Sequence, residues 1–263
     1  MASSFLVSFI GSGNLAWHLA PALDNAGFVV REVFSQNPSN AEALTERLYQ
    51  AEVKATLDFS TSESKIFIVA VTDDAIGDVA REIIIPEEAI LVHTSGSQPL
   101  SQLQFAATQN TGVLYPLQTF SKAKKIDFKT VPIFIESNNL ETEEALLLIA
   151  KSISKEVHKI GSEERKALHV AAVFASNFSN HMLTIAKKIM QQNNLDYDWL
   201  KPLISETINK SMMVGPEEAQ TGPARRGDLE TLDKHLELLN ENPSLAGIYK
   251  MISQHIIDQY QPE

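Results

Sequence analysis

A glycine turn near the N-terminus carries the clearest chemical signal in this sequence. Residues Gly11-Ser12-Gly13-Asn14-Leu15-Ala16 match the pattern G-x-G-x-x-G/A, directly after an apolar run and directly before a helical pattern. In such a turn the first glycine makes the bend, the second lets a pyrophosphate approach the backbone, and the small sixth residue allows close helix–strand packing. The helix N-terminus then faces the phosphates. We therefore predict that residues 11–15 bind the pyrophosphate of a dinucleotide.

The segment after the second predicted strand indicates which dinucleotide binds. NAD sites usually place a carboxylate there, on the ribose 2′-hydroxyl. This chain has Ser35-Gln36-Asn37 instead, and Glu32 lies inside the strand, too early for that role. Hydroxyl and amide donors before a helix N-terminus could accept a 2′-phosphate, so the sequence favours NADP over NAD. The segment holds no arginine, so a cation would have to reach it from Arg31 or Lys54.

Three more polar segments follow predicted strands, and ligands of such folds bind at the carboxyl ends of parallel strands. The segments are Val71-Thr72-Asp73-Asp74-Ala75-Ile76, His93-Thr94-Ser95-Gly96-Ser97 and Tyr115-Pro116-Leu117-Gln118-Thr119-Phe120. We assign to the cofactor site Val71, Thr72, Asp73, Ile76 and Thr94, and to substrate anchoring Ser95. For the carboxylates of Asp73 and Asp74, capping of the next helix is the favoured alternative. His93 could be an acid/base group or a buried histidine bonded to backbone, and the sequence leaves both open.

The second half of the chain contributes polar residues on a long helical pattern. His169, Val173, Asn177 and Asn180 fall at i, i+4, i+8 and i+11, which predicts one face of one helix. Polar side chains on an apolar helix are costly to bury unless they are paired or face a cleft. We predict that His169 and Asn177 line a cleft; a hydrogen-bonded pair between helices is the alternative. Lys166 could join that face or remain a surface lysine.

A turn with two arginines precedes a later helix, at Thr221-Gly222-Pro223-Ala224-Arg225-Arg226-Gly227-Asp228. Arginines held between Gly-Pro and Gly can present a rigid fork to a carboxylate or phosphate. A solvated loop is the equal alternative. Asp228 is the predicted N-cap of the helix that follows.

The periodicity of the chain predicts the scaffold for these residues. Short β-branched or aromatic runs predict strands over residues 5–10, 29–34, 66–71, 90–93, 112–115, 131–135 and 157–160, with helical patterns between them. From residue 161, helical patterns alone remain, over residues 165–192, 199–213, 229–239 and 244–260. We therefore predict the α/β class: a doubly wound Rossmann domain, residues 1–160, followed by an all-α domain, residues 161–263.

Composition and charge indicate which classes of binding partner are disfavoured. A net charge of −11 disfavours nucleic acid and anionic membranes, and no stretch approaches the roughly 20 apolar residues of a membrane span. The chain has no cysteine, so disulfides and thiolate chemistry are excluded, and we find no metal site or nucleophile. The N-terminus lacks the pattern of a signal peptide, so we expect a cytoplasmic protein. Apolar helices in so small a second domain also predict a homodimer.

These motifs together resemble a family of NADP oxidoreductases that have a Rossmann-like domain and a helical domain of uncharacterised function. The resemblance rests on the glycine turn, the segments after residues 71, 93 and 115, the pair His169 and Asn177, and the arginine turn. It implies a C-terminal domain similar to the helical dimerisation half of 6-phosphogluconate dehydrogenase and pyrroline-5-carboxylate reductase. The β-hydroxyacid dehydrogenases place a lysine, and an asparagine one turn later, where this chain has His169 and Asn177. Their lysine mechanism therefore cannot be carried over, and Tyr115 is a poor catalytic candidate because many relatives have histidine there.

The leading hypothesis is hydride transfer between NADP(H) and a small carbonyl, imine or hydroxy compound. His169 would act as acid/base, Asn177 would orient the substrate, and Arg225 or Arg226 would hold an anionic group. The rival hypothesis is a regulatory protein that binds the dinucleotide without catalysis. A hydrolase or transferase would need a metal or nucleophile that the sequence does not offer.

Overall fold

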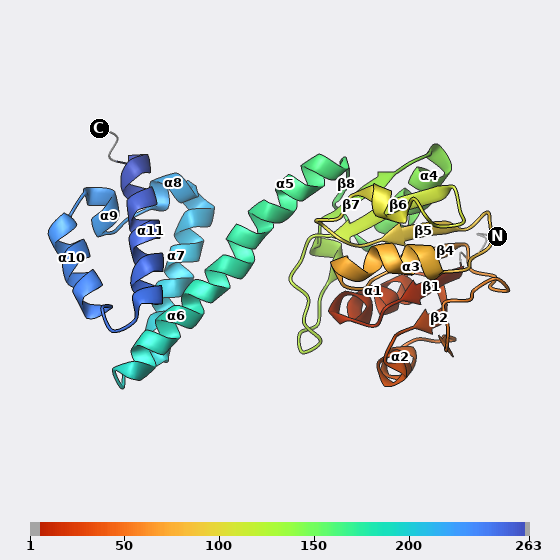
Figure 1. The fold of residues 1–263 in the computed structure, drawn as a ribbon, viewed down its shortest axis with the longest axis horizontal. Helices are drawn as coiled ribbons and strands as arrows, with labels where there is room; N and C mark the ends of the chain where they lie inside the picture. Colours follow the sequence, from red (N-terminus) through yellow and green to blue (C-terminus); the bar gives the residue numbers. More distant parts are fainter. Residues whose placement is uncertain (1–5, 261–263) are drawn as a thin grey trace. The chain divides into compact units, whose positions relative to one another are not determined.

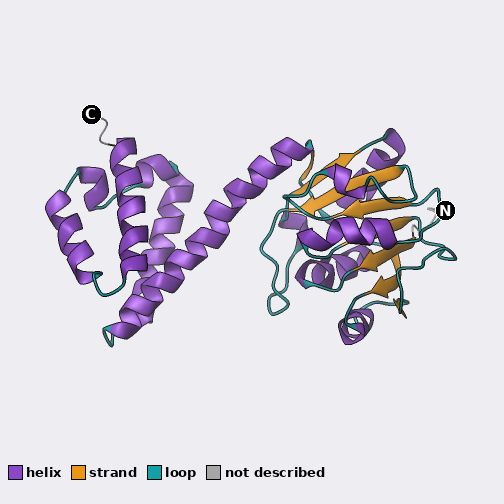
Figure 2. Cartoon of the chain, viewed as in Figure 1, coloured by secondary structure: helices purple, strands orange, loops and turns teal. Residues whose placement is uncertain are grey.

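The computed structural model describes residues 6–260 (Figure 1). Its contacts divide the chain into two compact units, Met1–Asn177 and Phe178–Glu263, and each is described by itself. Within the described residues, strands occur in the first unit alone, as Figure 2 shows in orange. None of the helices described in residues 6–260 is both long enough and apolar enough to cross a membrane.

The first unit is built on one eight-stranded sheet in the order β3-β2-β1-β4-β5-β6-β7-β8. The strands are β1 (Leu6–Ile10), β2 (Val29–Phe34), β3 (Glu52–Lys54), β4 (Ile66–Val69), β5 (Ile90–His93), β6 (Asn110–Pro116), β7 (Ile133–Ser137) and β8 (Val157–Lys159). All neighbours are parallel except β6 and β7. The strand order reverses between β1 and β4, and in such sheets the reversal leaves a crevice at the carboxyl ends.

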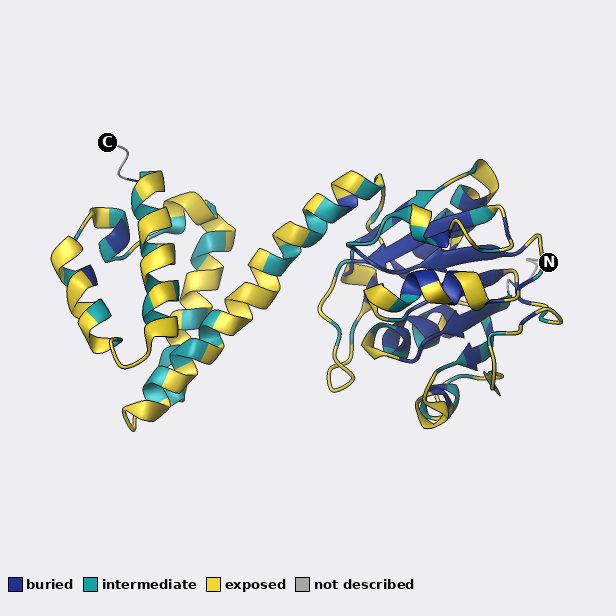
Figure 3. Ribbon diagram, viewed as in Figure 1, coloured by how far each residue is buried: buried dark blue, intermediate teal, exposed yellow. Residues whose placement is uncertain are grey.

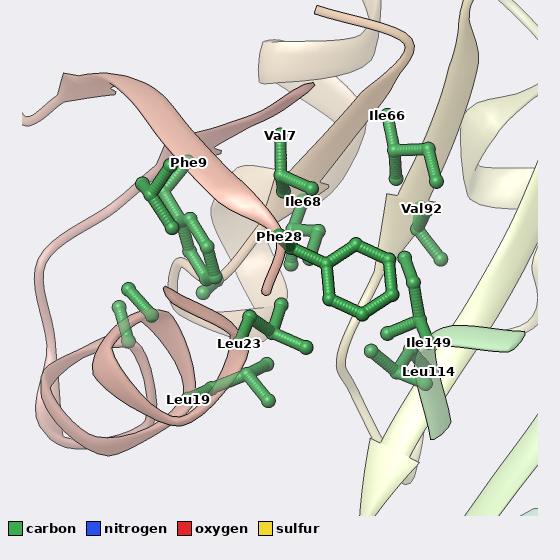
Figure 4. Packing of buried hydrophobic residues seen from close by; sticks show 14 of the residues in the cluster. Val7, Phe9, Leu19, Leu23, Phe28, Ile66, Ile68, Val92, Leu114 and Ile149 are labelled. Atoms are coloured by element: carbon green, nitrogen blue, oxygen red, sulfur yellow. The ribbon is translucent and has the colours of Figure 1, made fainter. Parts of the chain in front are cut away.

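Helices cover both faces of this sheet because successive side chains of a strand point to opposite faces. The helices of the first unit are α1 (Asn14–Asn25), α2 (Pro38–Thr45), α3 (Ile76–Glu82), α4 (Leu140–Ile153) and α5 (Ser162–Ala172). Val7 and Phe9 of β1 belong to the core that includes α1 and α4, whereas Ile10 belongs to the core that includes α3. Figure 4 shows the first of these cores, where Leu19 and Leu23 of α1 meet the strands.

Three helix ends follow from local residue types. Gly27, just after α1, has a φ of +97°, which glycine adopts without strain. The carboxylate of Asp228 accepts a hydrogen bond from the Thr231 N–H at 3.2 Å, and Asn242 accepts one from the Leu245 N–H at 3.2 Å. Both bonds cap helices near the end of the chain, and the one at Asp228 confirms the N-cap that the sequence predicted.

The second unit is helical. Its helices are α6 (Ser179–Gln192), α7 (Lys201–Val214), α8 (Pro216–Ala219), α9 (Pro223–Arg226), α10 (Leu229–Leu238) and α11 (Pro243–Tyr260). Figure 3 shows the sheet mostly buried, in dark blue, while these helices are largely intermediate or exposed. Ala224 and Leu232 are the buried hydrophobic residues of this unit among those described.

The predicted fold class, a doubly wound Rossmann sheet followed by helices, is confirmed. Residue 5 of the first predicted strand lies outside the described residues. Three features differ from the prediction: β3 was not expected, β7 is antiparallel to β6, and the arginine turn forms the short helix α9. The last strand ends at Lys159, near the predicted domain boundary, whereas the contacts divide the chain after Asn177. The boundary at residue 160 therefore stays a prediction.

The single predicted helix over residues 165–192 is three segments. A π-helical segment, Val173–Phe178, joins α5 to α6. A π turn holds one residue more than an α turn, so it rotates the residues beyond it by about 100° relative to a continuous α-helix. The prediction that His169, Asn177 and Asn180 share one face assumed a continuous α-helix, and the π-helical segment departs from that assumption.

Candidate functional site

The glycine turn joins β1 to α1 in a conformation that requires glycine. Gly11 has a φ of +107°, and a Cβ there would lie 2.3 Å from the carbonyl oxygen of Ala70. Gly13 is the N-cap of α1, so the first backbone N–H groups of the helix point out of the turn. The Ser12 hydroxyl donates to the Ser35 hydroxyl at 2.9 Å, which connects the turn to the end of β2.

A cavity of about 1090 Å³ opens at this edge of the sheet, entirely within the first unit. The predicted site residues that line it are Gly11, Ser12, Gly13, Asn14, Leu15, Ser35, Gln36, Val71, Thr72, Asp73, Thr94, Ser95 and His169. Its volume is slightly above the roughly 300–1,000 Å³ that is usual for ligand pockets, so it can admit a molecule as large as a dinucleotide. The close approach of backbone at Gly11 and the open N-terminus of α1 fit a pyrophosphate.

Two predicted cofactor residues do not line the cavity. The Asn37 side chain instead caps α2, accepting a hydrogen bond from the Ser39 N–H at 3.1 Å. The Ile76 side chain is in the hydrophobic core on the α3 face of the sheet. A residue that sequence reasoning missed, Asn40 on the first turns of α2, lines the cavity beside Ser35 and Gln36. These two residues with Asn40 form the neutral polar end of the cavity.

The cations considered for this end are engaged elsewhere. Lys54 pairs with Glu32 at 3.7 Å, and Glu32 also accepts a hydrogen bond from the Ser8 hydroxyl at 2.7 Å. Arg31 pairs with Glu52 at 3.8 Å. Neither Lys54 nor Arg31 lines the cavity. The carboxylate of Glu32 is likewise committed to structure, as its position inside β2 predicted.

Asp73 and Asp74 do not cap a helix, so that interpretation is wrong. The N-cap position of their short 3₁₀ turn is Thr72, and no side chain makes a capping hydrogen bond there or at the start of α3. Asp73 instead accepts a hydrogen bond from the Ser97 hydroxyl at 2.5 Å. This bond joins the segment after β4 to the segment after β5 at the rim of the cavity.

Of the two roles left open for His93, the structure shows the buried histidine bonded to backbone. Its side chain is fully buried, and its Nδ1 accepts a hydrogen bond from the Ser95 N–H at 3.2 Å. Burial, with a further contribution from the Arg165 guanidinium, lowers the pKa of His93 to about 3. An imidazole that stays neutral at ordinary pH and does not line the cavity has a structural role.

Arg165 of α5, which the sequence did not single out, holds the segment after β5 in place. Its guanidinium is fully buried and donates to the carbonyl oxygens of Ser95 at 2.9 Å and Gln98 at 2.7 Å. It also pairs with the Glu136 carboxylate of β7 at 2.7 Å. One side chain thus fixes the loop at the cavity wall, the sheet and the start of α5.

His169 lies one helical turn beyond Arg165 and reaches the cavity. Its Nδ1 is 3.2 Å from the Tyr115 hydroxyl of β6, and the two rings meet edge to face. Gly96 leaves the room for this pair, since a Cβ there would lie 2.6 Å from both His169 Nδ1 and Tyr115 Cζ. Burial raises the pKa of Tyr115, so its hydroxyl stays protonated and can donate.

The Ser95 hydroxyl shapes the loop that carries it. It accepts hydrogen bonds from the backbone N–H of Ser97 at 3.1 Å and of Gln98 at 3.0 Å. Asn177 is exposed in the π-helical segment and does not line the cavity of the first unit. Lys166 pairs with Glu163 at 2.7 Å on α5. The roles predicted for Ser95 and Asn177 stay predictions.

The two arginines of α9 belong to the second unit and differ in their contacts. Arg225 donates to the carbonyl oxygens of Glu217 at 3.0 Å and Gln220 at 2.5 Å, and its guanidinium lies 4.9 Å from the Tyr260 ring centroid. Arg226 is 65% exposed and 4.0 Å from Asp228. Arg225 therefore stabilises its own unit, whereas Arg226 is more open to solvent.

Two family models match this chain. Residues 6–96 match the family described as "NADP oxidoreductase coenzyme F420-dependent", and residues 131–256 match a domain of unknown function (DUF2520). None of the curated proteins matches the chain.

Solved structures match along nearly the whole chain. One from Bacteroides fragilis, described as a "putative NADP oxidoreductase", is 38% identical, with 97% of this chain and 98% of that chain covered and a TM-score of 0.88. A protein from Thermotoga maritima is 21% identical, with 95% and 97% covered and a TM-score of 0.76. A reductive aminase from Aspergillus terreus in complex with NADPH and ethyl levulinate shares the fold at 12% identity, with 98% and 95% covered and a TM-score of 0.71.

Proposed function

Because this chain belongs to the NADP oxidoreductase family of the Bacteroides fragilis protein, we propose that it transfers a hydride between NADP(H) and a small carbonyl, imine or hydroxy compound. The family agrees with NADP as the cofactor predicted from the sequence. One observation carries the proposal: the glycine turn and the Tyr115–His169 pair line the same cavity. A cofactor held at one end would bring its reactive ring toward an acid/base group at the other.

The residues of the cavity divide between the parts of the cofactor. Gly11, Gly13 and the N-terminus of α1 would hold the pyrophosphate. Ser35, Gln36 and Asn40 would surround the ribose that carries the 2′-phosphate. When bound, NADPH supplies the hydride of the reduction. The segment after β5 would then lie against the nicotinamide and the substrate.

His169 supports the acid/base part of the proposal. A hydride that adds to the carbon of C=O or C=N leaves the oxygen or nitrogen in need of a proton, and an imidazole at the cavity wall can deliver one. A proton donated by the Tyr115 hydroxyl to Nδ1 would leave the ring proton of His169 on Nε2. Tyr115 would thus fix the tautomer and orientation of His169.

Other substrate contacts follow from the sequence. Ser95, which lines the cavity, would anchor the substrate. The sequence also proposes that Asn177 orients the substrate and that an arginine holds an anionic group, and Arg226 is more open to solvent than Arg225. A substrate held in this way would be small and polar.

The rival function is binding of NADP without catalysis, for regulation. Calorimetric titration of the protein with NADPH, followed by assays of NADPH oxidation with aldehydes, ketones and imines, separates the two. For the enzyme, His169→Gln should lower turnover by about 10²–10⁴-fold, the range for general acid–base catalysis. NADPH affinity should stay within about twofold, less than 0.5 kcal/mol.

His158→Gln is the matched control, because His158 stacks on Phe134 at β8 and does not line the cavity. It should keep both turnover and NADPH affinity. A wild-type protein that binds NADPH but reduces no compound of the panel would favour the regulatory function.

We also propose a homodimer. The helix α7 supports it by exposing Leu203, Ile208, Met212 and Met213, which are more than half exposed in this chain. Large apolar side chains left exposed on one helix are the kind of surface that contact with a second chain would cover. Size-exclusion chromatography with light scattering should give the mass of two chains, and a monomer at all concentrations would overturn this proposal.

A further inference from the structure

The charge of the cavity is unusual for a site that takes a phosphate-rich ligand. Asp73, Asp78 and Glu82 line it, and the glycine turn contributes neutral side chains. Within residues 6–260, the one lysine or arginine that lines the cavity is Lys122. A pyrophosphate is held most strongly by charge-assisted hydrogen bonds. Lys122 is therefore the residue that can place a positive charge beside a ligand in this cavity.

Lys122 lies beside the first turns of α1. Its Nζ is 4.7 Å from the centroid of the Trp17 ring. The Trp17 N–H donates to the carbonyl oxygen of Gly13 at 2.9 Å, so Trp17 is one helical turn from the glycine turn. Trp17 is partly buried, and contact of an ammonium with such a ring is weak compared with its hydrogen bond to a phosphate. The lysine can therefore exchange the ring for a phosphate oxygen.

The loop that carries Lys122 is attached to α1. It follows β6, and its Ser121 carbonyl oxygen is 2.9 Å from Nε2 of His18. The Phe120 ring stacks on Phe128, with centroids 6.0 Å apart. These contacts of the two residues before it keep Lys122 close to the first turns of α1, while its own side chain is exposed. Lys124 on the same loop has the same charge but does not line the cavity.

We propose that Lys122 binds the pyrophosphate of the dinucleotide and supplies the positive charge that the glycine turn lacks. The inference rests on the proposed function, since it assumes that a dinucleotide occupies the cavity. The pyrophosphate is chosen over the 2′-phosphate because Lys122 lies at α1, whereas the neutral donors Ser35 and Asn40 lie at the end of β2 and the start of α2.

The test compares Lys122→Gln with Lys124→Gln in calorimetric titrations with NADPH and with NADH. Both variants remove one charge from the same exposed loop, and thermal unfolding checks that both fold. Lys122→Gln should lower the affinity for NADPH and for NADH by the same factor, roughly 10–100-fold, because both dinucleotides carry the pyrophosphate. It should also flatten the dependence of the dissociation constant on salt. Lys124→Gln should change affinity by no more than about twofold.

Three results would overturn the inference. Lys122→Gln could bind both dinucleotides as the wild type does, the two variants could weaken binding equally, or the loss could be confined to NADPH. The last result would place Lys122 on the 2′-phosphate. A wild-type protein that binds neither dinucleotide would instead overturn the cofactor assignment itself, and this inference with it.

Discussion

The Tyr115 hydroxyl lies 3.2 Å from Nδ1 of His169, so the strand β6 and the helix α5 are joined at the wall of the cavity. Arg165, one turn earlier on α5, anchors that helix through its bond to the Ser95 carbonyl oxygen and its ion pair with Glu136. Two contacts therefore hold His169 in place: Arg165 anchors the start of its helix, and the Tyr115 hydroxyl contacts its ring.

Removal of the phenol hydroxyl tests the orientation of His169. Tyr115→Phe keeps the ring but deletes one hydrogen bond, worth about 1–1.5 kcal/mol, so we expect turnover to fall about tenfold. NADPH affinity should not change. Nitrogen NMR of the histidines should show a change of tautomer at His169; an unaltered His169 signal would mean that Tyr115 does not orient the ring.

A methyl group at Gly96 should displace the pair. The Cβ of Gly96→Ala would lie 2.6 Å from His169 Nδ1, so we expect a loss of about 1–3 kcal/mol of unfolding free energy, as in other overpacked sites. Gly247→Ala is the control, because Gly247 lies inside α11 with nothing within 4 Å of its Cβ. That change should stabilise the protein by about 0.5–1 kcal/mol. Urea denaturation measures both, and equal effects would contradict the packing at Gly96.

Substitution of Gly11 should abolish binding of the dinucleotide. Gly11→Ala combines a positive φ with a Cβ 2.3 Å from a carbonyl oxygen, so the turn must move. Gly27→Ala has a similar φ but nothing within 4 Å, so it isolates the backbone strain. We expect Gly27→Ala to destabilise the fold by about 1 kcal/mol and to bind NADPH normally. Calorimetry that found normal NADPH binding by Gly11→Ala would contradict the role of the turn.

The buried ion pair predicts a strongly non-additive double mutant. Arg165→Met leaves the Glu136 carboxylate without its cation, and we expect a loss of about 3–5 kcal/mol of unfolding free energy. Glu136→Gln in the same chain removes the remaining charge and should recover part of that loss. Urea denaturation of the two single variants and the double variant measures the coupling; additive losses would show that the pair is not coupled.

His93 predicts how stability depends on pH. Its pKa in the folded protein is about 3, below the ordinary value of 6.5, so the unfolded chain binds the proton more tightly. Stability is therefore fully present above about pH 6.5 and decreases as the pH falls toward 3, by roughly 1.4 kcal/mol per pH unit within that interval. His93→Asn keeps an acceptor near the Ser95 N–H but cannot titrate, so its unfolding free energy should fall less steeply with acid. Equal slopes for the two proteins would contradict the neutral buried state of His93.

Local sequence signals identified much of the fold and one end of the cavity. The glycine turn was predictable because the conformation at Gly11 and the helix start at Asn14 depend on neighbouring residues. The runs of β-branched residues located seven of the eight strands. A buried strand is rich in such residues whichever neighbour it pairs with, so the run is visible in the sequence alone. The strand that escaped, β3, is three residues long at the sheet edge and has two charged residues, Glu52 and Lys54, so it carries no apolar pattern.

The partners of each side chain depended on contacts that no local pattern encodes. Arg165 looks like an ordinary charged residue at the start of a helix, yet it is fully buried against residues about 70 positions earlier. Tyr115 gained importance through a histidine 54 residues away, and the helix that carries Asn177 is interrupted by a π-helical segment that the periodicity did not predict. Turns and the apolar patterns of helices and strands follow from the conformational preferences of adjacent residues, so the sequence was sufficient to predict them. Which polar groups meet depends on how the elements pack, because burial of a charge or hydroxyl is tolerated only where a distant partner satisfies it.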